Sequence, residues 1–365
     1  MNAENWNASK GSADPLGSVL NELERRWPEM ESDDGPLEEQ FQTLAAAGIL
    51  GWVIPEEYGG TEVPTRELNS GYLELSEACL TTAFVLTQRN GACQRLARSE
   101  NEQLKARLLP ALCSGEMFAT VGISHLTTSS QHLGRPAVGA TRQSGHWLLD
   151  GMVPWITAGT MADSVVIGAT CGDGTQLLLS VDTDLPGMEM TVPPQLMSMN
   201  GSRTGALRLN NVKVDDDLVI AGPVEQVMQS GVGAGTGSVT TSALALGLAR
   251  RALRTLADEA VQRTELEEIV ARFEAEWRTA VSLFEANQDG SRSSTPSSND
   301  VRERANSLVL RVTQACLAAC KGRGFMAGHP AERLVREAMF FLVWSCPQPV
   351  LAAALQELAC STFDS

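Results

Sequence analysis

The spacing of apolar residues changes twice along this chain, and these changes set the order of its domains. From Thr65 to Leu112 apolar side chains recur every three or four residues, which is typical of helices with one buried face. Between Phe118 and Val214 the apolar runs are short and are separated by turn residues, which is typical of strands. After Gly222 the helical spacing returns. The sequence therefore predicts an α+β multidomain fold in the order α, β, α.

Four regions are expected, divided where the spacing changes. They are a disordered tail, an N-terminal α-helical domain, a middle β domain built as a barrel or sandwich, and a C-terminal four-helix bundle, at residues 1–14, 15–116, 117–221 and 222–365 respectively. In the last region three long amphipathic helices are predicted, with a fourth near Pro347 to Leu358. The Ser/Gly/Pro-rich segment 287–299 is expected to be a flexible loop, because helical spacing resumes after it.

Local patterns predict where several elements begin and end. Pro15 to Arg26 is expected to form the first helix. A short helix is expected from Glu102 to Leu109, stopped by Pro110. Asp150-Gly151 is a turn dipeptide that is expected to end a strand, and Asn210-Asn211 is expected to split the last strands of the β domain.

Net charge and the length of the apolar runs exclude two classes of partner. The chain has 28 Lys and Arg against 44 Asp and Glu, a net charge of −16, so it lacks the attraction that draws proteins to nucleic-acid phosphates. Its longest apolar runs are far shorter than the roughly 20 residues that a membrane helix needs. We therefore expect no nucleic-acid partner and no membrane partner.

Cysteines, histidines and the first residues bear on metals and on location. The 8 cysteines form no CxxC pair and the 4 histidines have no metal-ligand spacing, so no metal site is expected. The first residues carry neither the positive stretch nor the apolar stretch of a secretory signal. A reducing, cytoplasmic location is the expectation.

Common nucleotide-binding and hydrolase motifs are absent from the sequence. It contains no GxSxG, Walker A or SxxK pattern. The glycine run from Gly231 to Gly237 lacks the GxGxxG spacing and follows no apolar strand. A flexible entry to a helix is therefore favoured over a phosphate-binding loop.

Several short strings carry a resemblance that covers most of the chain. They are Leu44–Gly60, Glu102–Glu116, Trp155–Thr157, Leu196–Val214 with MNGSR inside it, Gly247–Arg263, Gly322–Phe325 and PAERLVREA at 330–338. Each string alone is unspecific. Together, their order and spacing resemble the acyl-CoA dehydrogenase family from about Leu37 to Leu358.

The resemblance implies a cofactor, a substrate and an assembly. Members of that family bind FAD between the β domain and the C-terminal bundle, and oxidise an acyl-CoA thioester while a glutamate removes the α-proton. They are homodimers or homotetramers, and some relatives form mixed oligomers, so a homo-oligomer or a hetero-oligomer with a paralogue is expected. The cofactor-binding residues that the resemblance implies are Ser124, Ser130, Trp155, Thr157, Arg263, Gly322 and Gly324.

The sequence departs from the family pattern where the catalytic base is expected. The two positions at which family members place the glutamate hold Trp344 and Gly237, and neither residue can accept a proton. The indole of Trp344 is expected to fill the pocket or to stack on the flavin ring. His125 is a candidate for a relocated base, because imidazole titrates near neutral pH.

Three functions remain open at this point. The first is a flavin-dependent oxidoreductase that oxidises a CH–CH bond of an acyl thioester or a similar small substrate, with a non-standard or partner-supplied base. The second is a flavin monooxygenase-like enzyme on the same fold, which needs no glutamate because reduced flavin and oxygen carry the reaction. The third is a non-catalytic subunit of a mixed acyl-CoA dehydrogenase-like oligomer. The chemistry of the site has to distinguish them.

Overall fold

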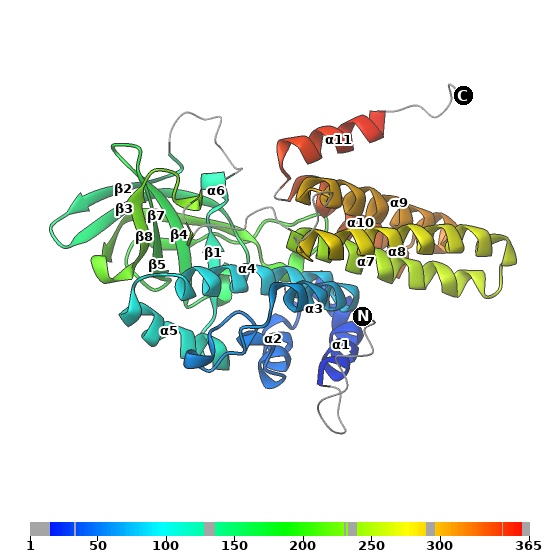
Figure 1. The fold of residues 1–365 in the computed structure, drawn as a ribbon, viewed down its shortest axis with the longest axis horizontal. Helices are drawn as coiled ribbons and strands as arrows, with labels where there is room; N and C mark the ends of the chain where they lie inside the picture. Colours follow the sequence, from blue (N-terminus) through cyan, green and yellow to red (C-terminus); the bar gives the residue numbers. More distant parts are fainter. Residues whose placement is uncertain are drawn as a thin grey trace.

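The structure is a computed structural model that describes residues 15–32, 34–127, 136–229, 231–232, 239–289, 296–344 and 346–359. The predicted order of a helical domain, a β domain and a helical bundle is confirmed (Figure 1). The predicted disordered tail at 1–14 lies outside the described residues. No helix in the described ranges is long and apolar enough to cross a membrane.

The N-terminal domain consists of five α-helices joined by short 3₁₀ turns. They are α1 (Pro15–Arg26), α2 (Leu37–Ala46), α3 (Thr65–Ala78), α4 (Leu80–Ala97) and α5 (Glu102–Ser114). Helix α1 has the predicted bounds. Helix α5 does not stop at Pro110 but runs through it, which corrects the expected end at Leu109. Its leucines at 108, 109 and 112 are all buried, and this packing holds the helix together across the proline.

The middle domain is one open sheet of eight strands, in which the order along the sheet is β6-β7-β3-β2-β4-β5-β8 and β1 pairs with β4. The strands are β1 (Ala119–Gly122), β2 (Val138–Gln143), β3 (His146–Ile156), β4 (Ser164–Cys171), β5 (Gln176–Asp182), β6 (Met188–Met190), β7 (Gly205–Asp215) and β8 (Val219–Val224). A one-turn helix, α6 (Ser124–Thr127), follows β1. Of the two forms expected for this domain, the sheet is not a closed barrel, because no pairing joins its two end strands in the described part.

The two dipeptides expected to form turns, Asp150-Gly151 and Asn210-Asn211, lie opposite each other within the paired strands β3 and β7. Strand β3 continues through Asp150-Gly151, and β7 continues through Asn210-Asn211. The register between these strands shifts between Leu149 and Gly151, so β7 carries one extra residue there, which is a β-bulge. Gly151 has φ 136°, and an added Cβ would lie 2.1 Å from the carbonyl oxygen of Ala137. The glycine therefore serves the close approach of β2, not a hairpin turn.

The C-terminal bundle is formed by α7, α8, α9 and α10, with α11 on its outside. The bounds are α7 (Val239–Ala260), α8 (Glu267–Asp289), α9 (Ser298–Gly324), α10 (Pro330–Val343) and α11 (Gln348–Ala359). Helix α10 packs on both α7 and α9, whereas α11 packs on α9 and stands apart from the other three (Figure 1). The fourth bundle helix is therefore α10, and the helix predicted near Pro347 to Leu358 is an additional one.

The loop predicted at 287–299 is shorter than expected. Helix α8 extends to Asp289, and α9 is already capped at Ser297, whose hydroxyl accepts a hydrogen bond from the Asp300 amide while the Asp300 carboxylate accepts one from the Ser297 amide. Only residues 290–295 between these helices lie outside the description. Asn287 and Gln288 are thus held on a helix, and both contribute to the site described below.

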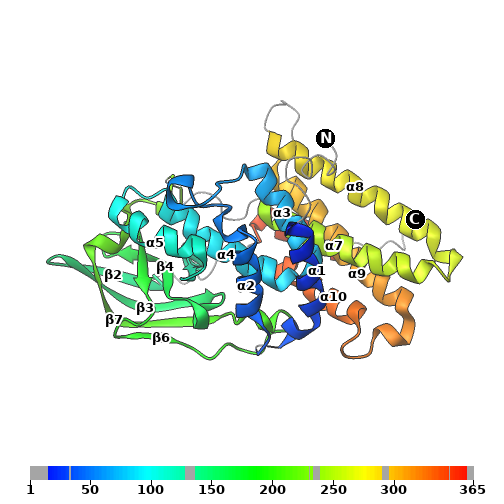
Figure 2. The same ribbon diagram turned by 90° about the horizontal axis from the view of Figure 1, so that it is seen from below.

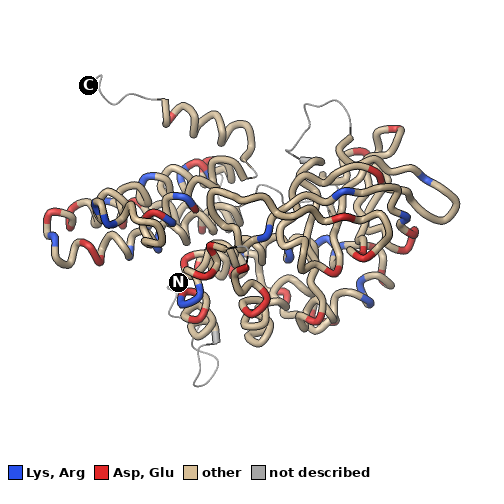
Figure 3. The backbone as a smooth tube through the Cα atoms, turned by 180° about the vertical axis from the view of Figure 1, so that it is seen from behind, with Lys and Arg blue, Asp and Glu red and all other residues tan. Residues whose placement is uncertain are grey.

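Helices α3 and α4 lie between the β domain and the bundle (Figures 1 and 2). Helix α4 packs on β1 on one side and on α7 on the other, and α3 packs along α7. The buried apolar residues of all three domains form one contiguous core. Charged residues occur along the chain in all three domains (Figure 3). Since α4 touches every domain, its exposed face borders the space where they meet.

Candidate functional site

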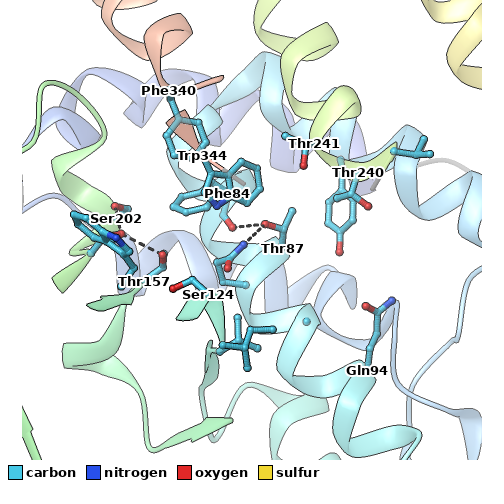
Figure 4. A pocket seen from close by; sticks show the side chains of 18 of the residues that line it. Phe84, Thr87, Gln94, Ser124, Thr157, Ser202, Thr240, Thr241, Phe340 and Trp344 are labelled. Carbon is cyan, nitrogen blue, oxygen red and sulfur yellow. Dashed lines mark hydrogen bonds between the residues drawn. The ribbon is translucent and has the colours of Figure 1, made fainter. Parts of the chain in front are cut away.

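A cavity of about 640 Å³ lies where the three domains meet. Its walls come from α3 and α4, from the ends of β1 and β3, from the turn at 198–204, and from the neighbouring ends of α7, α8 and α10. Figure 4 shows polar side chains on the β-domain side and aromatic side chains where α10 ends. A space that is bounded by rigid elements of several domains is the usual setting for a small-molecule site.

The β domain contributes a row of hydroxyl groups to the cavity. Thr204 Oγ1 donates to Thr157 Oγ1 at 3.2 Å and lies 2.9 Å from Ser202 Oγ. Thr120 Oγ1 donates to the carbonyl of Thr157 at 2.8 Å, which fixes the end of β3. Trp155, two residues earlier on β3, also lines the cavity and is 50% exposed. An indole left half exposed beside ordered hydroxyls is suited to contact a ligand.

The turn that carries Ser202 is held in a strained backbone conformation. Met199 and Arg203 have φ of 63° and 47°, in the left-handed region. The Arg203 guanidinium forms an ion pair with Glu38 and donates to the carbonyl of Gly35 at 3.0 Å, which anchors the turn to the N-terminal domain. Ser198 precedes this turn, and its buried Oγ has no hydrogen-bond partner among the described residues although it lines the cavity.

An aromatic cluster closes the end of the cavity where α10 stops. The rings of Phe340 and Trp344 are stacked, with centroids 4.9 Å apart and planes 17° apart, and Phe84 of α4 meets both edge-on. Arg302 Nη2 donates to the carbonyl of Trp344 at 3.0 Å and fixes the chain just after α10. Burial lowers the pKa of Arg302 to about 10. Trp344 is therefore part of a packed aromatic wall.

The charges along the cavity all have one sign. Arg95 and Arg98, near the C-terminal end of α4, are the charged members of the described lining, which contains no Asp, Glu, Lys or His. Burial, and secondarily the nearby positive charge of Arg98, lower the pKa of Arg95 to about 10. The pKa of Tyr72 is raised by burial, so this phenol remains protonated. No described group therefore offers a carboxylate or an imidazole to a ligand in the cavity.

Three of the segments outside the described residues contain no carboxylate in their sequence either. Residues 128–135, 233–238 and 290–295 contain no Asp or Glu. The first of these segments contains His132, which is its one side chain able to take up a proton near neutral pH. Within the described ranges, no three His, Cys, Asp or Glu side chains are grouped so that they could hold a metal ion.

The structure places four of the residues singled out by sequence on the cavity. Ser124, Trp155, Thr157 and Trp344 all line it. His125 does not: it is 8% exposed, and its Nε2 lies 2.8 Å from the carbonyl oxygen of Gly168, away from the lining. Ser130 and Gly237 lie outside the described residues.

Three other predicted cofactor residues are remote from the cavity within one chain. Arg263, after α7, donates through Nη1 to the carbonyl of Ala319 and through Nε to Glu265 at 3.1 Å. Gly322 and Gly324 are in the last turn of α9, and none of the three lines the cavity. Their role in binding a cofactor stays a prediction.

Sequence reasoning missed the face that α4 turns to the cavity. Phe84, Gln88, Gly91, Arg95 and Arg98 all line it, and they follow one another at steps of four and three residues. That spacing marks one helix face. A helix that is buried on most sides normally has apolar residues on such a face. The polar residues on this face could therefore have predicted that it borders a ligand.

The β-domain wall fits the flavin ring that the family resemblance implies. A flavin ring is flat and aromatic, with nitrogen and oxygen atoms along one edge. Trp155 supplies an aromatic neighbour, and the row of Thr157, Thr204 and Ser202 supplies hydroxyls. The buried Ser198 Oγ without a partner is a group that the polar edge of a ligand would satisfy. The hydroxyl groups and the indole of this wall thus agree with the polar edge and the flat ring of this cofactor.

Comparison with known proteins gives the same family. Residues 18–116 match the family model described as "Acyl-CoA dehydrogenase, N-terminal domain". A probable acyl-CoA dehydrogenase of Bacillus subtilis (strain 168) is 25% identical over 82% of this chain and 83% of that protein. The 3-sulfinopropanoyl-CoA desulfinase of Paraburkholderia xenovorans (strain LB400) is 24% identical over 83% of this chain and 82% of its own length.

Solved structures share the fold over nearly the whole chain. The butyryl-CoA dehydrogenase of Megasphaera elsdenii superposes with a TM-score of 0.77 at 19% identity, covering 95% of this chain and 100% of that one. At this identity the likeness concerns the fold. The family model, the curated relatives and the shared fold together indicate the acyl-CoA dehydrogenase family, whose members are FAD-dependent.

Proposed function

We propose that this chain is a flavin-dependent oxidoreductase that acts on an acyl thioester or a similar small substrate, without a carboxylate base from its own cavity. The observation that carries the proposal is the β-domain wall, where Trp155, Thr157 and the unpartnered hydroxyl of Ser198 face the cavity. A bound flavin would supply the electron-accepting chemistry at this wall. The relatives' printed names, which include a dehydrogenase and a desulfinase acting on CoA thioesters, support the substrate class.

The residues of the chain have two tasks in this proposal. Trp155, Thr157, Ser124 and Ser198 would hold and orient the flavin ring against the β domain. The aromatic wall of Phe84, Phe340 and Trp344 excludes water from the reacting end. A proton beside a thioester carbonyl needs a base to remove it, and the lining described above offers none.

The missing base favours a second candidate within the same cofactor class. A flavin monooxygenase-like reaction uses reduced flavin and oxygen and needs no carboxylate at the position of Trp344. The first candidate, dehydrogenation of a CH–CH bond, requires a base that another chain or a segment outside the description supplies. The two candidates differ in their need for oxygen, which a direct measurement separates.

The first experiment is the visible absorption spectrum of the purified protein, before and after addition of FAD and desalting. Retained flavin bands near one flavin per chain would support the proposal. Turnover would then be followed with a panel of acyl-CoA thioesters, under argon with an electron-accepting dye and under air with a flavin reductase. Dye reduction under argon favours dehydrogenation, and turnover only under air favours monooxygenation. A protein that takes up no flavin overturns both and leaves the non-catalytic subunit.

Ser198→Ala tests the assignment of the flavin wall. We expect this variant to bind FAD about three- to tenfold more weakly, because one buried hydrogen bond to the ligand is lost. The matched control is Ser242→Ala, which removes another buried hydroxyl without a partner among the described residues, on α7 and outside the cavity lining. Equal FAD affinity in both variants and the parent would contradict a role for Ser198 at the flavin.

A further inference from the structure

We propose that the Tyr72 hydroxyl donates a hydrogen bond to an uncharged oxygen, a keto or hydroxyl group, in the acyl chain of the substrate. The inference rests on the proposed function, since it takes the flavin to lie on the β-domain wall of the same cavity. It adds a substrate class: a thioester whose acyl chain carries such an oxygen instead of being a plain alkyl chain.

The side chain of Asn90 fixes the role of the Tyr72 oxygen. Arg89 Nη1 lies 2.8 Å from the Asn90 amide and can only donate, so the Asn90 atom that faces it is the carbonyl oxygen. The Asn90 nitrogen then faces the Tyr72 oxygen at 2.8 Å and donates to it. Tyr72 is therefore the acceptor in its contact with Asn90, and its own proton is left for another group.

The proton of the Tyr72 hydroxyl has no acceptor among the described residues. Within them, the hydroxyl takes part only in the hydrogen bond that it accepts from Asn90. Tyr72 is 2% exposed and lines the cavity. Burial raises its pKa, so the phenol keeps its proton at neutral pH. A buried donor without an acceptor costs stability, and a ligand oxygen in the cavity would satisfy it.

Three lining residues linked by hydrogen bonds make the α3 side of the cavity polar and uncharged. Thr240 Oγ1 donates to Asn69 Oδ1 at 3.0 Å, and Asn69 Nδ2 donates to Gln288 Oε1 at 3.0 Å. Asn69 precedes Tyr72 by three residues on α3, so the two belong to one helix face. A plain alkyl chain would remove water from these groups without replacing its hydrogen bonds, whereas an oxygen in the chain can bond to them.

The α3 side of the cavity is separate from the wall assigned to the flavin. In Figure 4, Thr240, which is bonded to α3 through Asn69, lies on the other side of the cavity from Thr157 and Ser202. The thioester carbonyl has to lie beside the flavin for a reaction at the neighbouring carbon. An oxygen further along the acyl chain is therefore favoured over the thioester carbonyl as the partner of Tyr72.

The test uses four pantetheine probes that differ in one oxygen at a time. S-hexyl, S-(4-oxohexyl) and S-(5-oxohexyl) pantetheine are thioethers that differ in a keto group, and S-hexanoyl pantetheine adds the thioester carbonyl. Binding to the full chain, with and without FAD, is measured by titration calorimetry. We expect at least one keto thioether to bind about three- to tenfold more tightly than the hexyl thioether, and Tyr72→Phe to remove that gain.

Tyr58→Phe is the matched control, because Tyr58 is the other tyrosine of the chain and does not line the cavity. It should leave all four affinities unchanged. Tyr72→Phe also removes the acceptor of Asn90, so a purely structural role of Tyr72 predicts lower stability with unchanged preference between the probes. That result overturns the proposal, and so does equal binding of the three thioethers by the parent. A loss confined to the advantage of the thioester over the hexyl thioether assigns Tyr72 to the thioester carbonyl and also overturns it.

Fluorine NMR of the chain labelled with 3-fluorotyrosine keeps the test valid if Tyr72→Phe fails to fold. The chain has 2 tyrosines, so two resonances are expected, and Tyr58→Phe assigns them. The preferred keto thioether should shift the Tyr72 resonance more than the hexyl thioether does, and should leave the Tyr58 resonance in place. Equal shifts of the Tyr72 resonance by both thioethers would contradict the proposal.

The FAD measurements keep this inference and the proposed function distinguishable. If FAD is bound but no keto probe is preferred, the role of Tyr72 is wrong and the oxidoreductase stands. If no FAD is bound but a keto probe still binds more tightly through Tyr72, the role of Tyr72 stands and the oxidoreductase fails. A loss of FAD affinity in Tyr72→Phe with unchanged probe preference assigns the hydroxyl to the cofactor and overturns the proposal.

Discussion

Trp344 occupies the position at which the family resemblance implies a catalytic glutamate, and its surroundings are built for an indole. Its ring stacks on Phe340 and meets Phe84 edge-on, and Arg302 holds its backbone carbonyl. We expect Trp344→Glu not to create acyl-CoA dehydrogenase activity, because a carboxylate among these rings would have a raised pKa and an unfilled space beside it. The measurement is dye reduction with butyryl-CoA under argon.

Trp344→Phe is the matched control for that substitution, because it removes the indole while keeping an aromatic ring. It should retain the FAD affinity of the parent more closely than Trp344→Glu does. Rapid dye reduction by Trp344→Glu alone would show that the pocket already accommodates an acid, and that the aromatic wall is less specific than its packing indicates.

His125 provides a pH-dependent contribution to stability whose sign follows from its burial. Burial lowers its pKa below the ordinary value, and only the hydrogen bond to Gly168 opposes this. The buried Nδ1 has no partner among the described residues, so protonation there would add an N–H without an acceptor. Because the folded pKa lies below the unfolded one, the stabilisation is present above the unfolded value of about 6.5 and is lost as pH falls through the folded pKa.

The expected result is a smaller pH dependence of unfolding in His125→Gln. Urea unfolding at pH 7.5 and pH 5.5 should give a larger loss of stability for the parent than for the variant. The Gln amide can donate to the Gly168 carbonyl at either pH. Equal losses in the two proteins would contradict a titrating His125.

The sequence named some of the residues that line the cavity and missed others. Trp155 and Thr157 could be named because the short string that contains them resembles a strand end of the family. Arg98 could not, since its place on the cavity depends on which face of α4 the β domain leaves uncovered. Ser198 likewise owes its position on the cavity to a turn that Arg203 anchors to the N-terminal domain, through a contact between residues far apart in the sequence.

Gly247 sets how closely helix α7 approaches α3. A Cβ at this position would lie 2.2 Å from the carbonyl oxygen of Leu73 and 2.8 Å from Ser76 Cβ, and helices can only relieve such overlap by moving apart. We expect Gly247→Ala to destabilise the fold by about 1–3 kcal/mol despite the better helix propensity of alanine. Thermal or urea unfolding of the purified variant measures this.

Gly322→Ala is the matched control, because a Cβ there meets nothing within 4 Å. This variant should have a stability close to that of the parent. An equally stable Gly247→Ala would mean that α3 and α7 shift without cost, and would contradict the close contact.

Element boundaries followed the sequence where local signals and packing agreed. Helix α1 has the approximate bounds that the local pattern predicted. Pro110 failed as a stop because buried leucines on both sides keep α5 helical, and Asp150-Gly151 failed as a turn because β2 and β7 both pair with β3. Packing and strand pairing with distant parts of the chain can outweigh a local residue that disfavours a helix or strand. The sequence alone does not identify those distant parts.

The three domains share one core and one cavity, so ligand binding should act on all of them together. The β domain, helices α3 and α4, and the ends of α7, α8 and α10 each form part of the cavity wall. A ligand that binds only the folded protein stabilises it by about 2.7 kcal/mol at a hundredfold excess over the dissociation constant. FAD should therefore raise the transition temperature of the whole chain by several degrees.

Differential scanning calorimetry with and without FAD checks this expectation at the scale of the molecule. Because α4 packs on β1 and on α7, the domains should unfold in one transition when FAD is bound. Ser198→Ala should show a smaller shift than the parent at the same FAD concentration, while Ser242→Ala should not. A shift limited to one of two separate transitions would place the cofactor within a single domain, and would contradict a site that depends on all three.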